Sequence, residues 1–425
     1  MLSAETATCT RDYCNFSVVC QLTHGFTVAP SAYSDHMDEL LPPENDPRRL
    51  PVREWLANHP NPTPREFAES GYVAPHWPAP YGLGADPVQQ IIIDDEFARA
   101  GMKRPSNQIG IGWAAPTIIF AGTQEQKDRY VIPALAAEEI WCQLFSEPGA
   151  GSDLAGLSTR AVRDGDEWVI NGQKVWTTGA HYSKFGILIA RTDPDAPKHK
   201  GITYFICPMD LPGIEIRTIK NIAGAESFNE VFFTDVRIPH ENVVGDVNDG
   251  WRLAKVTLGN ERVSLSTGGV LWGAGSTALN IIEEAKKLGP HSAAMRQRLA
   301  RLYIEHTVIE IIRMRTLTAR LRGEQPGPEA SIRKIMADEH GQRAMEVARD
   351  ITGADAMIIG EPDAKTGKTI RSKSWYSGYM FSKALTIGGG TGEVQRNILG
   401  ERVLGLPAEP DPDKGLSWAD TRRGG

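Results

Sequence analysis

Two segments of this chain have the residue types that suit a phosphorylated or planar polar ligand. The first is Leu144–Asp153 (LFSEPGAGSD), whose glycines expose backbone N–H groups with little side-chain bulk, so that a ligand can approach closely. The second is Val175–Thr178 (VWTT), where Trp176 adds an indole and Thr177 and Thr178 add hydroxyls. Most glycine-rich turns are only turns, so the pairing of the two segments is the informative feature.

The residues around these segments alternate between apolar and polar side chains, which is typical of half-buried strands. Asn171-Gly172 is a strong hairpin-turn signal within this region. Short strands separated by turns predict a small β-barrel or sandwich over residues 141–245. The expected strands lie around Trp168 and Ile170, at Val175, and over Gly186–Ala190, Ile202–Ile206, Ile214–Ile216 and Val231–Phe233.

Helical periodicity dominates on both sides of this β region. Residues 37–140 predict an N-terminal helical domain, with helices over Val52–Asn58, Pro64–Ser70, Val88–Ala100, Trp113–Phe120 and Gln124–Ala136 and an N-cap at Thr123. Residues 246–407 predict an antiparallel four-helix bundle, with amphipathic runs over Trp251–Leu288, Ala293–Leu321, Glu329–Gly353 and Gly392–Leu404. The predicted fold class is therefore α+β multidomain. Residues 408–425 form a tail, and residues 1–36 are an irregular extension or precede a true start at Met37.

The two glycine- and hydroxyl-rich segments resemble the flavin-binding signature of the acyl-CoA dehydrogenase family. The match has no gap over Trp141–Arg191, and the order helices, β domain, helices over residues 37–407 is also that of the family. The resemblance implies that FAD binds between the β domain and the bundle. It also implies α,β-desaturation of an acyl-CoA thioester, by removal of the α-proton and transfer of the β-hydride to flavin N5, with an electron-transfer flavoprotein as the acceptor.

The resemblance also implies where the catalytic base lies. Most members carry it in a Glu-Gly-Thr segment near the C-terminus, but alignment on Thr391 places Gly389 at that position, and Glu393 lies one helical turn too late. Other members carry the base on a bundle helix, immediately before an arginine, and here Glu261 precedes Arg262. Glu261 is therefore the candidate base, with Arg262 holding the fold or a nearby acidic group. The alternative is that both residues form a charge pair on the helix surface.

The other site residues follow from the same resemblance. Ser146 and Thr178 would direct hydroxyls to the flavin ring, Trp176 would pack beside it, and the Gly389 N–H would donate to the thioester carbonyl. Thr391 would lie by the pyrophosphate, at a helix start that favours anions. The cofactor-binding set is Leu144, Ser146, Gly151, Ser152, Trp176, Thr177, Thr178, Thr391 and Glu393, and the substrate-binding set is Ser152, Arg262, Gly389 and Gly390. For each of these the alternative is a turn or packing role.

Two departures from the family pattern concern its subunit contacts. The usual Arg-x-x-Phe-Gly after the first bundle helix is replaced by residues 284–291 (EAKKLGPH), and the usual Gln-x-x-Gly-Gly by residues 350–354 (DITGA). Such losses resemble actinobacterial family members of sterol side-chain breakdown, some of which form mixed tetramers of two unlike chains. We expect a homodimer or homotetramer by default, and a mixed tetramer as the alternative. The run Gly388–Gly390 favours a branched, cyclic or bulky acyl group, although it can equally be a tight turn.

Bulk properties exclude several other classes of function. The 425 residues are 41% hydrophobic and 23% charged, as in ordinary soluble proteins of two or three domains. The net charge of −7 argues against nucleic acid or an anionic membrane as a partner, and no apolar run could span a bilayer. The five cysteines fit no zinc spacing, so we expect reduced thiols, a cytoplasmic protein and no metal site.

Two alternatives to a dehydrogenase keep the same fold. One is a related flavin oxidase or monooxygenase-like enzyme, in which oxygen takes the electrons. The other is a non-catalytic or half-site subunit that completes the flavin site of another chain. The eroded subunit motifs favour the second alternative, whereas the retained LFSEPGAGSD and VWTT segments and Glu261 argue against it.

Overall fold

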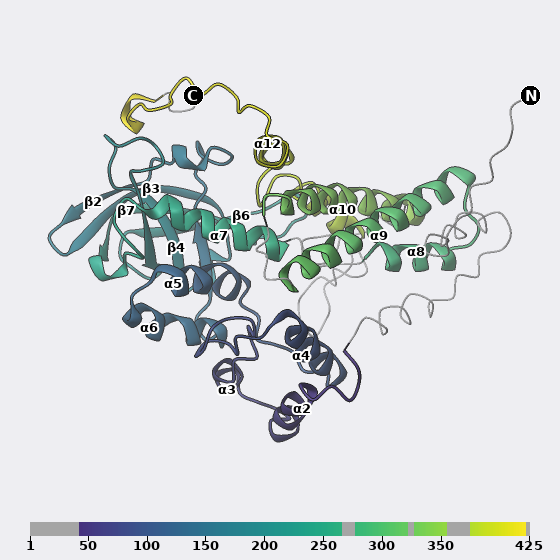
Figure 1. Ribbon diagram of the computed structural model, residues 1–425. Helices are drawn as coiled ribbons and strands as arrows, with labels where there is room; N and C mark the ends of the chain where they lie inside the picture. The colour runs from purple at the N-terminus through teal and green to yellow at the C-terminus, as the bar shows by residue number, and fades with distance from the viewer. Residues whose placement is uncertain (1–41, 266–276, 322–326, 355–374, 422–425) are drawn as a thin grey trace, which may run out of the picture.

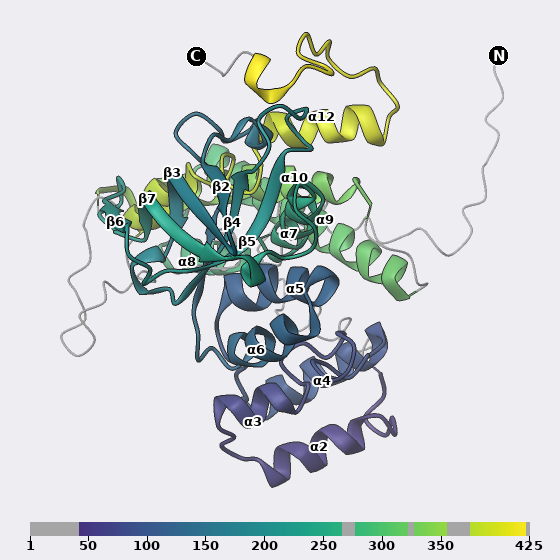
Figure 2. The ribbon, with the colours of Figure 1, turned by 90° about the vertical axis from the view of Figure 1, so that its left-hand side faces the viewer.

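The computed structural model describes residues 42–265, 277–321, 327–354 and 375–421. The predicted extension over residues 1–36 lies outside this part of the chain. N-terminal helices, a β-sheet and C-terminal helices follow one another along the chain (Figure 1). In the orthogonal view the N-terminal helices lie on one side of the sheet and α12 lies on the other (Figure 2).

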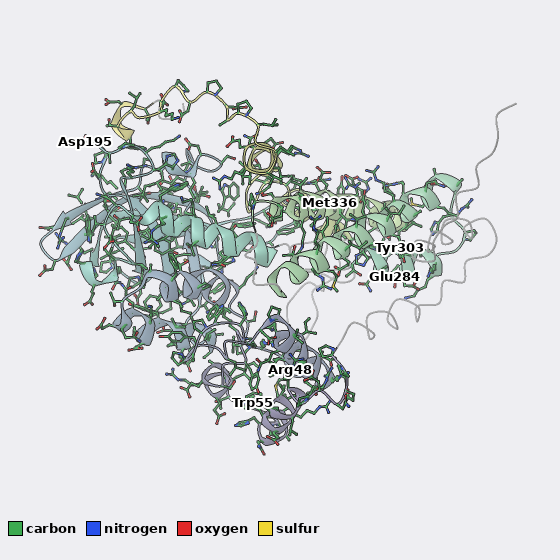
Figure 3. All side chains as sticks on the ribbon, viewed as in Figure 1. Arg48, Trp55, Asp195, Glu284, Tyr303 and Met336 are labelled. Carbon is green, nitrogen blue, oxygen red and sulfur yellow. The ribbon has the colours of Figure 1, made fainter. Side chains whose placement is uncertain are left out.

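The N-terminal helices begin at local capping signals. The predicted cap at Thr123 is confirmed, because its side chain accepts a hydrogen bond from the Gln126 N–H. Thr63 caps its helix in the same way. The rings of Trp55, labelled in Figure 3, and Phe97 lie 5.8 Å apart in the centre of this layer. The helices are α2 (Arg49–Asn58), α3 (Pro64–Glu69), α4 (Pro87–Arg99), α5 (Ala115–Ala121) and α6 (Gln124–Leu135), with one π-helical turn over Gly110–Ala114 before α5.

A seven-stranded mixed sheet forms the middle of the molecule. Its strand order is β1-β4-β2-β3-β7-β6, and β5 pairs with β4 as a branch from this path. Strands β1 and β4 run parallel, whereas β3 runs antiparallel to both β2 and β7. The strands are β1 (Trp141–Leu144), β2 (Arg160–Asp164), β3 (Glu167–Thr178), β4 (Phe185–Arg191), β5 (Ile202–Pro208), β6 (Ile214–Ile219) and β7 (Phe228–Pro239).

The hairpin predicted at Asn171-Gly172 is wrong. Both residues lie inside β3, and the turn that joins β2 to β3 is at Gly165, whose φ is +62°. At Gly172 the register with β7 shifts, and an added Cβ would lie 2.7 Å from the Cα of Thr159. The glycine is there because a neighbouring backbone passes close by, which a local turn signal cannot distinguish from a reversal.

The C-terminal helices fall into two groups. Helix α7 packs against β5 and α5, whereas α8, α9 and α10 share a separate core around Ile281, Leu302 and Met345. The predicted run Trp251–Leu288 is described as α7 and α8, and residues 266–276 between them lie outside the described residues. No helix in the described ranges is long and apolar enough to cross a membrane. The helices are α7 (Gly250–Leu265), α8 (Ala278–Lys287), α9 (Ala293–Leu321), α10 (Ala330–Thr352), α11 (Trp375–Ser382) and α12 (Gly392–Arg402).

The tail after α12 returns to the β domain and docks there (Figure 1). Trp418 donates its backbone N–H to the Ala196 carbonyl at 2.9 Å, and its side chain is 7% exposed. The Arg191 guanidinium lies 4.8 Å from the centroid of its indole. Asp195, labelled in Figure 3, lies beside this contact in the loop that receives the tail.

Candidate active site

The structure joins the two predicted ligand-binding segments directly. The Ser146 carbonyl accepts a hydrogen bond from the Val175 N–H at 2.9 Å, so the turn after β1 lies against the end of β3. Within the turn, Glu147 and Ala150 exchange two backbone hydrogen bonds. Gly149 and Gly151 have no atoms within 4 Å of an added Cβ. The turn is therefore anchored at its base and open at its glycines.

A buried ion pair that the sequence analysis missed holds this turn. The Lys174 ammonium donates to Glu147 Oε1 at 2.8 Å and to the Phe145 carbonyl at 2.9 Å. Glu147 also accepts from the backbone N–H groups of Ser158 and Thr159. Burial alone would raise the pKa of the Glu147 carboxyl, but the Lys174 charge and these hydrogen bonds outweigh it and lower the pKa to about 2.

Arg191 of β4 forms hydrogen bonds that hold the loop after Gly149 and Gly151. Its guanidinium donates to the carbonyls of Ala155 at 2.6 Å and Lys198 at 2.7 Å. Burial lowers the pKa of Arg191 to about 10, because desolvation disfavours the charged form of the guanidinium. The docked Trp418 covers the same guanidinium, so the tail contributes to the support of this loop.

The end of β3 presents its polar side chains in alternating directions. Trp176 is 60% exposed in a backbone conformation with φ +61°, at a register shift between β3 and β7. Thr178 is exposed, whereas Thr177 is buried and its hydroxyl has no hydrogen-bond partner among the described residues. Trp176 and Thr178 are therefore accessible to a ligand, and Thr177 Oγ1 is a buried polar atom without a partner.

The candidate base lies beside β1, the strand that leads into the same turn. Glu261 on α7 is 7% exposed, and its Oε2 accepts a hydrogen bond from Gln143 Nε2 at 3.1 Å. Leu144, the next residue, points its side chain into the opposite core of the sheet, so only its backbone can face a ligand. Arg262 lies on α7, and its side chain lies outside the described residues. The Glu261 carboxylate therefore lies in the interior rather than on the helix surface.

A cluster of buried hydroxyl groups fixes α7 one turn before Glu261. The Thr257 hydroxyl lies 2.8 Å from that of Thr117 on α5 and 3.0 Å from the Tyr204 hydroxyl on β5. All three side chains are fully buried. The helix that carries the carboxylate is thus held by the N-terminal helices and by the sheet.

The glycine turn before α12 forms a second group of candidate residues. It borders a cleft of about 410 Å³ against α10, lined by Thr386 and Thr391 on one side and by Glu339 and Gln342 on the other. Thr391 caps α12, because its hydroxyl accepts from the Val394 N–H at 3.2 Å. Among the described residues no acceptor takes the Gly389 N–H, so this donor is available to a ligand.

Glu393 lies on the exposed side of the first turn of α12. Its own backbone N–H and the Thr391 hydroxyl lower the pKa of its carboxyl. An exposed carboxylate of this kind is a poor general base, in line with its position one turn beyond the expected glutamate. Helix α10 contacts α7, α11 and α12, so it connects the helix of Glu261 with the glycine turn.

Three domain models of one family match the chain in order. They are the acyl-CoA dehydrogenase N-terminal domain over residues 43–139, the middle domain over residues 142–236 and the C-terminal domain over residues 248–404. The chain belongs to the acyl-CoA dehydrogenase family. It is therefore an oxidoreductase-type enzyme of that family, and its predicted fold class is confirmed.

Curated acyl-CoA dehydrogenases of Mycobacterium tuberculosis are among the similar proteins. Acyl-CoA dehydrogenase FadE34 is 44% identical over 80% of this chain, and the chain spans a little under half, 45%, of FadE34. Acyl-CoA dehydrogenase IpdE1 is 39% identical over 81% of this chain and 87% of its own length.

Two solved structures are also similar. The Tcur3481-Tcur3483 steroid ACAD has a TM-score of 0.68 at 28% identity and covers 90% of this chain and 99% of that chain. The ChsE4-ChsE5 complex from Mycobacterium tuberculosis has a TM-score of 0.68 at 30% identity and covers 90% of this chain and 100% of that chain.

Proposed function

We propose that this acyl-CoA dehydrogenase family member binds FAD and desaturates an acyl-CoA thioester between Cα and Cβ, with Glu261 as the base. The observation that supports this most directly is the burial of the Glu261 carboxylate beside Gln143, at the strand that leads into the glycine-rich turn. A buried carboxylate next to a ligand-binding loop is placed to take a proton from a bound molecule.

The described residues fit a flavin in three respects. The open space at Gly149 and Gly151 admits a close ligand. Within the described part of the chain, the buried Thr177 hydroxyl has no hydrogen-bond partner and the Gly389 N–H has no acceptor. When bound, FAD would supply the acceptor for the hydride that leaves Cβ. The residues that would hold it are Leu144 through its backbone, Ser146, Gly151, Ser152, Trp176, Thr177, Thr178, Thr391 and Glu393.

The chain's own residues would handle the proton and the developing negative charge. Glu261 takes the α-proton, and Gln143 keeps its carboxylate in one orientation. The Gly389 N–H donates to the thioester carbonyl oxygen, which gains negative charge as the proton leaves. Ser152, Arg262 and Gly390 complete the proposed substrate contacts. The absence of side chains over Gly388–Gly390 leaves room for a branched, cyclic or bulky acyl group, and the similar structure named as a steroid ACAD supports that substrate class.

The visible spectrum of the purified protein tests this proposal. We expect the purified protein to be yellow. The panel of thioesters is octanoyl-CoA, cyclohexanecarbonyl-CoA and a steroid propionyl-CoA, and under anaerobic conditions one of them should abolish the visible absorbance of the flavin. Replacing Glu261 by Gln should reduce the rate of this loss by at least about a hundredfold, since a positioned base contributes about 10²–10⁴-fold. Glu283→Gln, an exposed carboxylate on α8, is the matched control. Equal rates in Glu261→Gln and the wild type would exclude Glu261 as the base.

The electron acceptor is tested with the same reduced protein. We propose an electron-transfer flavoprotein, and reoxidation by it should be much faster than reoxidation by air. Rapid reoxidation in air alone would instead indicate an oxidase.

A shared flavin site in a mixed oligomer is the second candidate. At the end of α8, where the family's Arg-x-x-Phe-Gly is missing, Lys286 and Lys287 pair with Glu283 and Glu284 of their own helix. These cations are engaged within α8, and the similar ChsE4-ChsE5 structure is a complex of two chains. A colourless protein that gains flavin only when expressed with a second family member would favour this candidate, whereas a yellow homodimer or homotetramer would exclude it.

A further inference from the structure

A buried lysine on α10 holds the glycine turn from one side. Lys334 Nζ donates to the backbone carbonyls of Leu385 at 3.0 Å and Gly388 at 2.8 Å, and it also forms an ion pair with Asp338. Its side chain is 1% exposed. Burial of an ammonium group is unfavourable unless its partners compensate for the lost hydration, and an apolar side chain of similar volume would avoid that desolvation.

Gln395 of α12 holds the same turn from the other side. Its Nε2 donates to the carbonyls of Gly389 at 3.2 Å and Gly390 at 3.5 Å, and the residue is fully buried. The backbone φ angles are +67° at Gly389 and +91° at Gly390, and an added Cβ on Gly390 would lie 2.5 Å from Gln395 Nε2. Two buried side chains therefore take the successive carbonyls of a turn that requires glycine.

Holding a carbonyl also sets the direction of one particular N–H group. The Gly388 carbonyl and the Gly389 N–H belong to the same planar trans peptide unit, so they point in opposite directions. A hydrogen bond from Lys334 to the Gly388 oxygen therefore directs the Gly389 N–H away from α10. A charged donor on the oxygen also polarises the peptide unit, which makes its N–H a stronger donor.

We propose that Lys334 is a positioning residue of the active site, which directs and polarises the Gly389 N–H for the thioester carbonyl of the substrate. This inference rests on the proposed function, in which that N–H faces the thioester. Lys334 does not touch the substrate and acts only through the peptide unit between Gly388 and Gly389. Gln395 does the same for the next peptide unit, without a charge.

The kinetic test compares Lys334→Met and Lys334→Gln with the wild type in the full-length protein. The Gly389 donor matters most when the carbonyl becomes negative, so the rate of flavin reduction should fall by about 10–100-fold while thioester affinity changes little. Lys334→Gln keeps a neutral donor and should lie between Lys334→Met and the wild type. The control is Lys383→Met, an exposed lysine that follows α11 and pairs with Glu346.

A vibrational measurement separates this role from a merely structural one. The measurement uses Glu261→Gln, which should bind the thioester without reacting. The thioester that reduces the wild-type flavin is labelled with ¹³C at C1, and the frequency of its carbonyl stretch reports how strongly the bound carbonyl is polarised. The band should lie below that of the free thioester, and Lys334→Met should return it towards the free value. If Lys334→Met does not fold, Lys334→Gln, which keeps a neutral donor, is the second test, with a smaller expected loss of rate of about three- to tenfold and a smaller return of the band.

The outcomes distinguish this inference from the function on which it rests. If no thioester reduces the wild-type flavin, both proposals fail. If the wild type is reduced and its bound carbonyl band is shifted, but a folded Lys334→Met changes neither the band nor the rate by more than about twofold, the positioning role alone is refuted. Proportional loss of affinity and rate, with an unchanged band, would likewise leave Lys334 as a packing residue.

Discussion

Replacing Lys174 by Met should destabilise the protein strongly, because it leaves the Glu147 carboxylate buried without its counter-charge. Lys174 is fully buried and Glu147 nearly so. The carboxylate would keep its hydrogen bonds from Ser158 and Thr159 only if the turn did not move. We therefore expect lower stability and a lower flavin content together.

The pKa of Glu147 sets the scale of the effect. A fall from 4.5 to about 2 corresponds to about 3 kcal/mol in favour of the folded state at neutral pH. Burial lowers the pKa of Lys174, so desolvation of its ammonium group offsets part of this stabilisation. Removing only one partner leaves an uncompensated charge and should cost about 3–5 kcal/mol. The lowered pKa means that the contribution is complete above pH 4.5 and is lost as the pH falls from 4.5 towards 2.

Urea denaturation followed by tryptophan fluorescence measures the effect in a double-mutant cycle. Lys174→Met and Glu147→Gln should each lower the midpoint strongly, and the double variant should recover at least half of the sum of the two losses. The difference between the wild type and Lys174→Met should shrink as the pH falls below 4.5. Strictly additive losses, or a difference that does not change with pH, would refute the assignment of a coupled buried pair.

Three further predictions concern other parts of the molecule. Trp418→Ala should weaken flavin binding and expose the loop around Ala155 to proteolysis, because the indole covers the Arg191 guanidinium that binds the Ala155 carbonyl. Flavin retention and limited digestion measure both effects, and unchanged resistance of this loop to digestion would contradict the prediction. Gly390→Ala should cost more stability than Gly405→Ala, which shares a positive φ but has an open surrounding, by about 1–3 kcal/mol in thermal unfolding. Burial lowers the pKa of His340 below 6.5, so the unfolded state binds more protons than the folded state, and the free energy of unfolding should fall as the pH drops below 6.5. His340→Gln should remove part of this pH dependence, and a pH profile identical to that of the wild type would argue against the prediction.

Features that depend on local sequence were predicted well. The cap at Thr123 and the start of α6 follow from neighbouring residues alone, and the structure confirms them. The sequence signature of LFSEPGAGSD and VWTT was informative because the first segment follows β1 directly and the second forms the end of β3. The hairpin at Asn171-Gly172 failed because pairing with β7 continues through that dipeptide, and pairing between distant strands overrides a turn propensity.

Features that depend on distant contacts could not be predicted in the same way. Gln143 and Glu261 are separated by 118 residues, and only the packing of α7 on the sheet brings them together. Lys174 offered one usable signal, since a lysine at an inward position of an alternating strand requires a buried partner. Its partner, Glu147, lies 27 residues away, and nothing in the spacing identifies it.

The distribution of the hydrophobic cores divides the chain differently from its family domains. One continuous core runs from Val52 on α2, through the inner face of the sheet, to Leu253 and Ala254 on α7, whereas α8, α9 and α10 enclose a core of their own. Cooperative units follow shared cores rather than sequence borders. The N-terminal helices, the sheet and the first turns of α7 should therefore exchange their amide hydrogens as one unit, and the α8–α10 group as another. Helix α7, which carries Glu261, contacts both units, through β5 and α5 on one side and α10 on the other, so partial opening of either one should disturb the helix of the candidate base before the rest of the fold is lost.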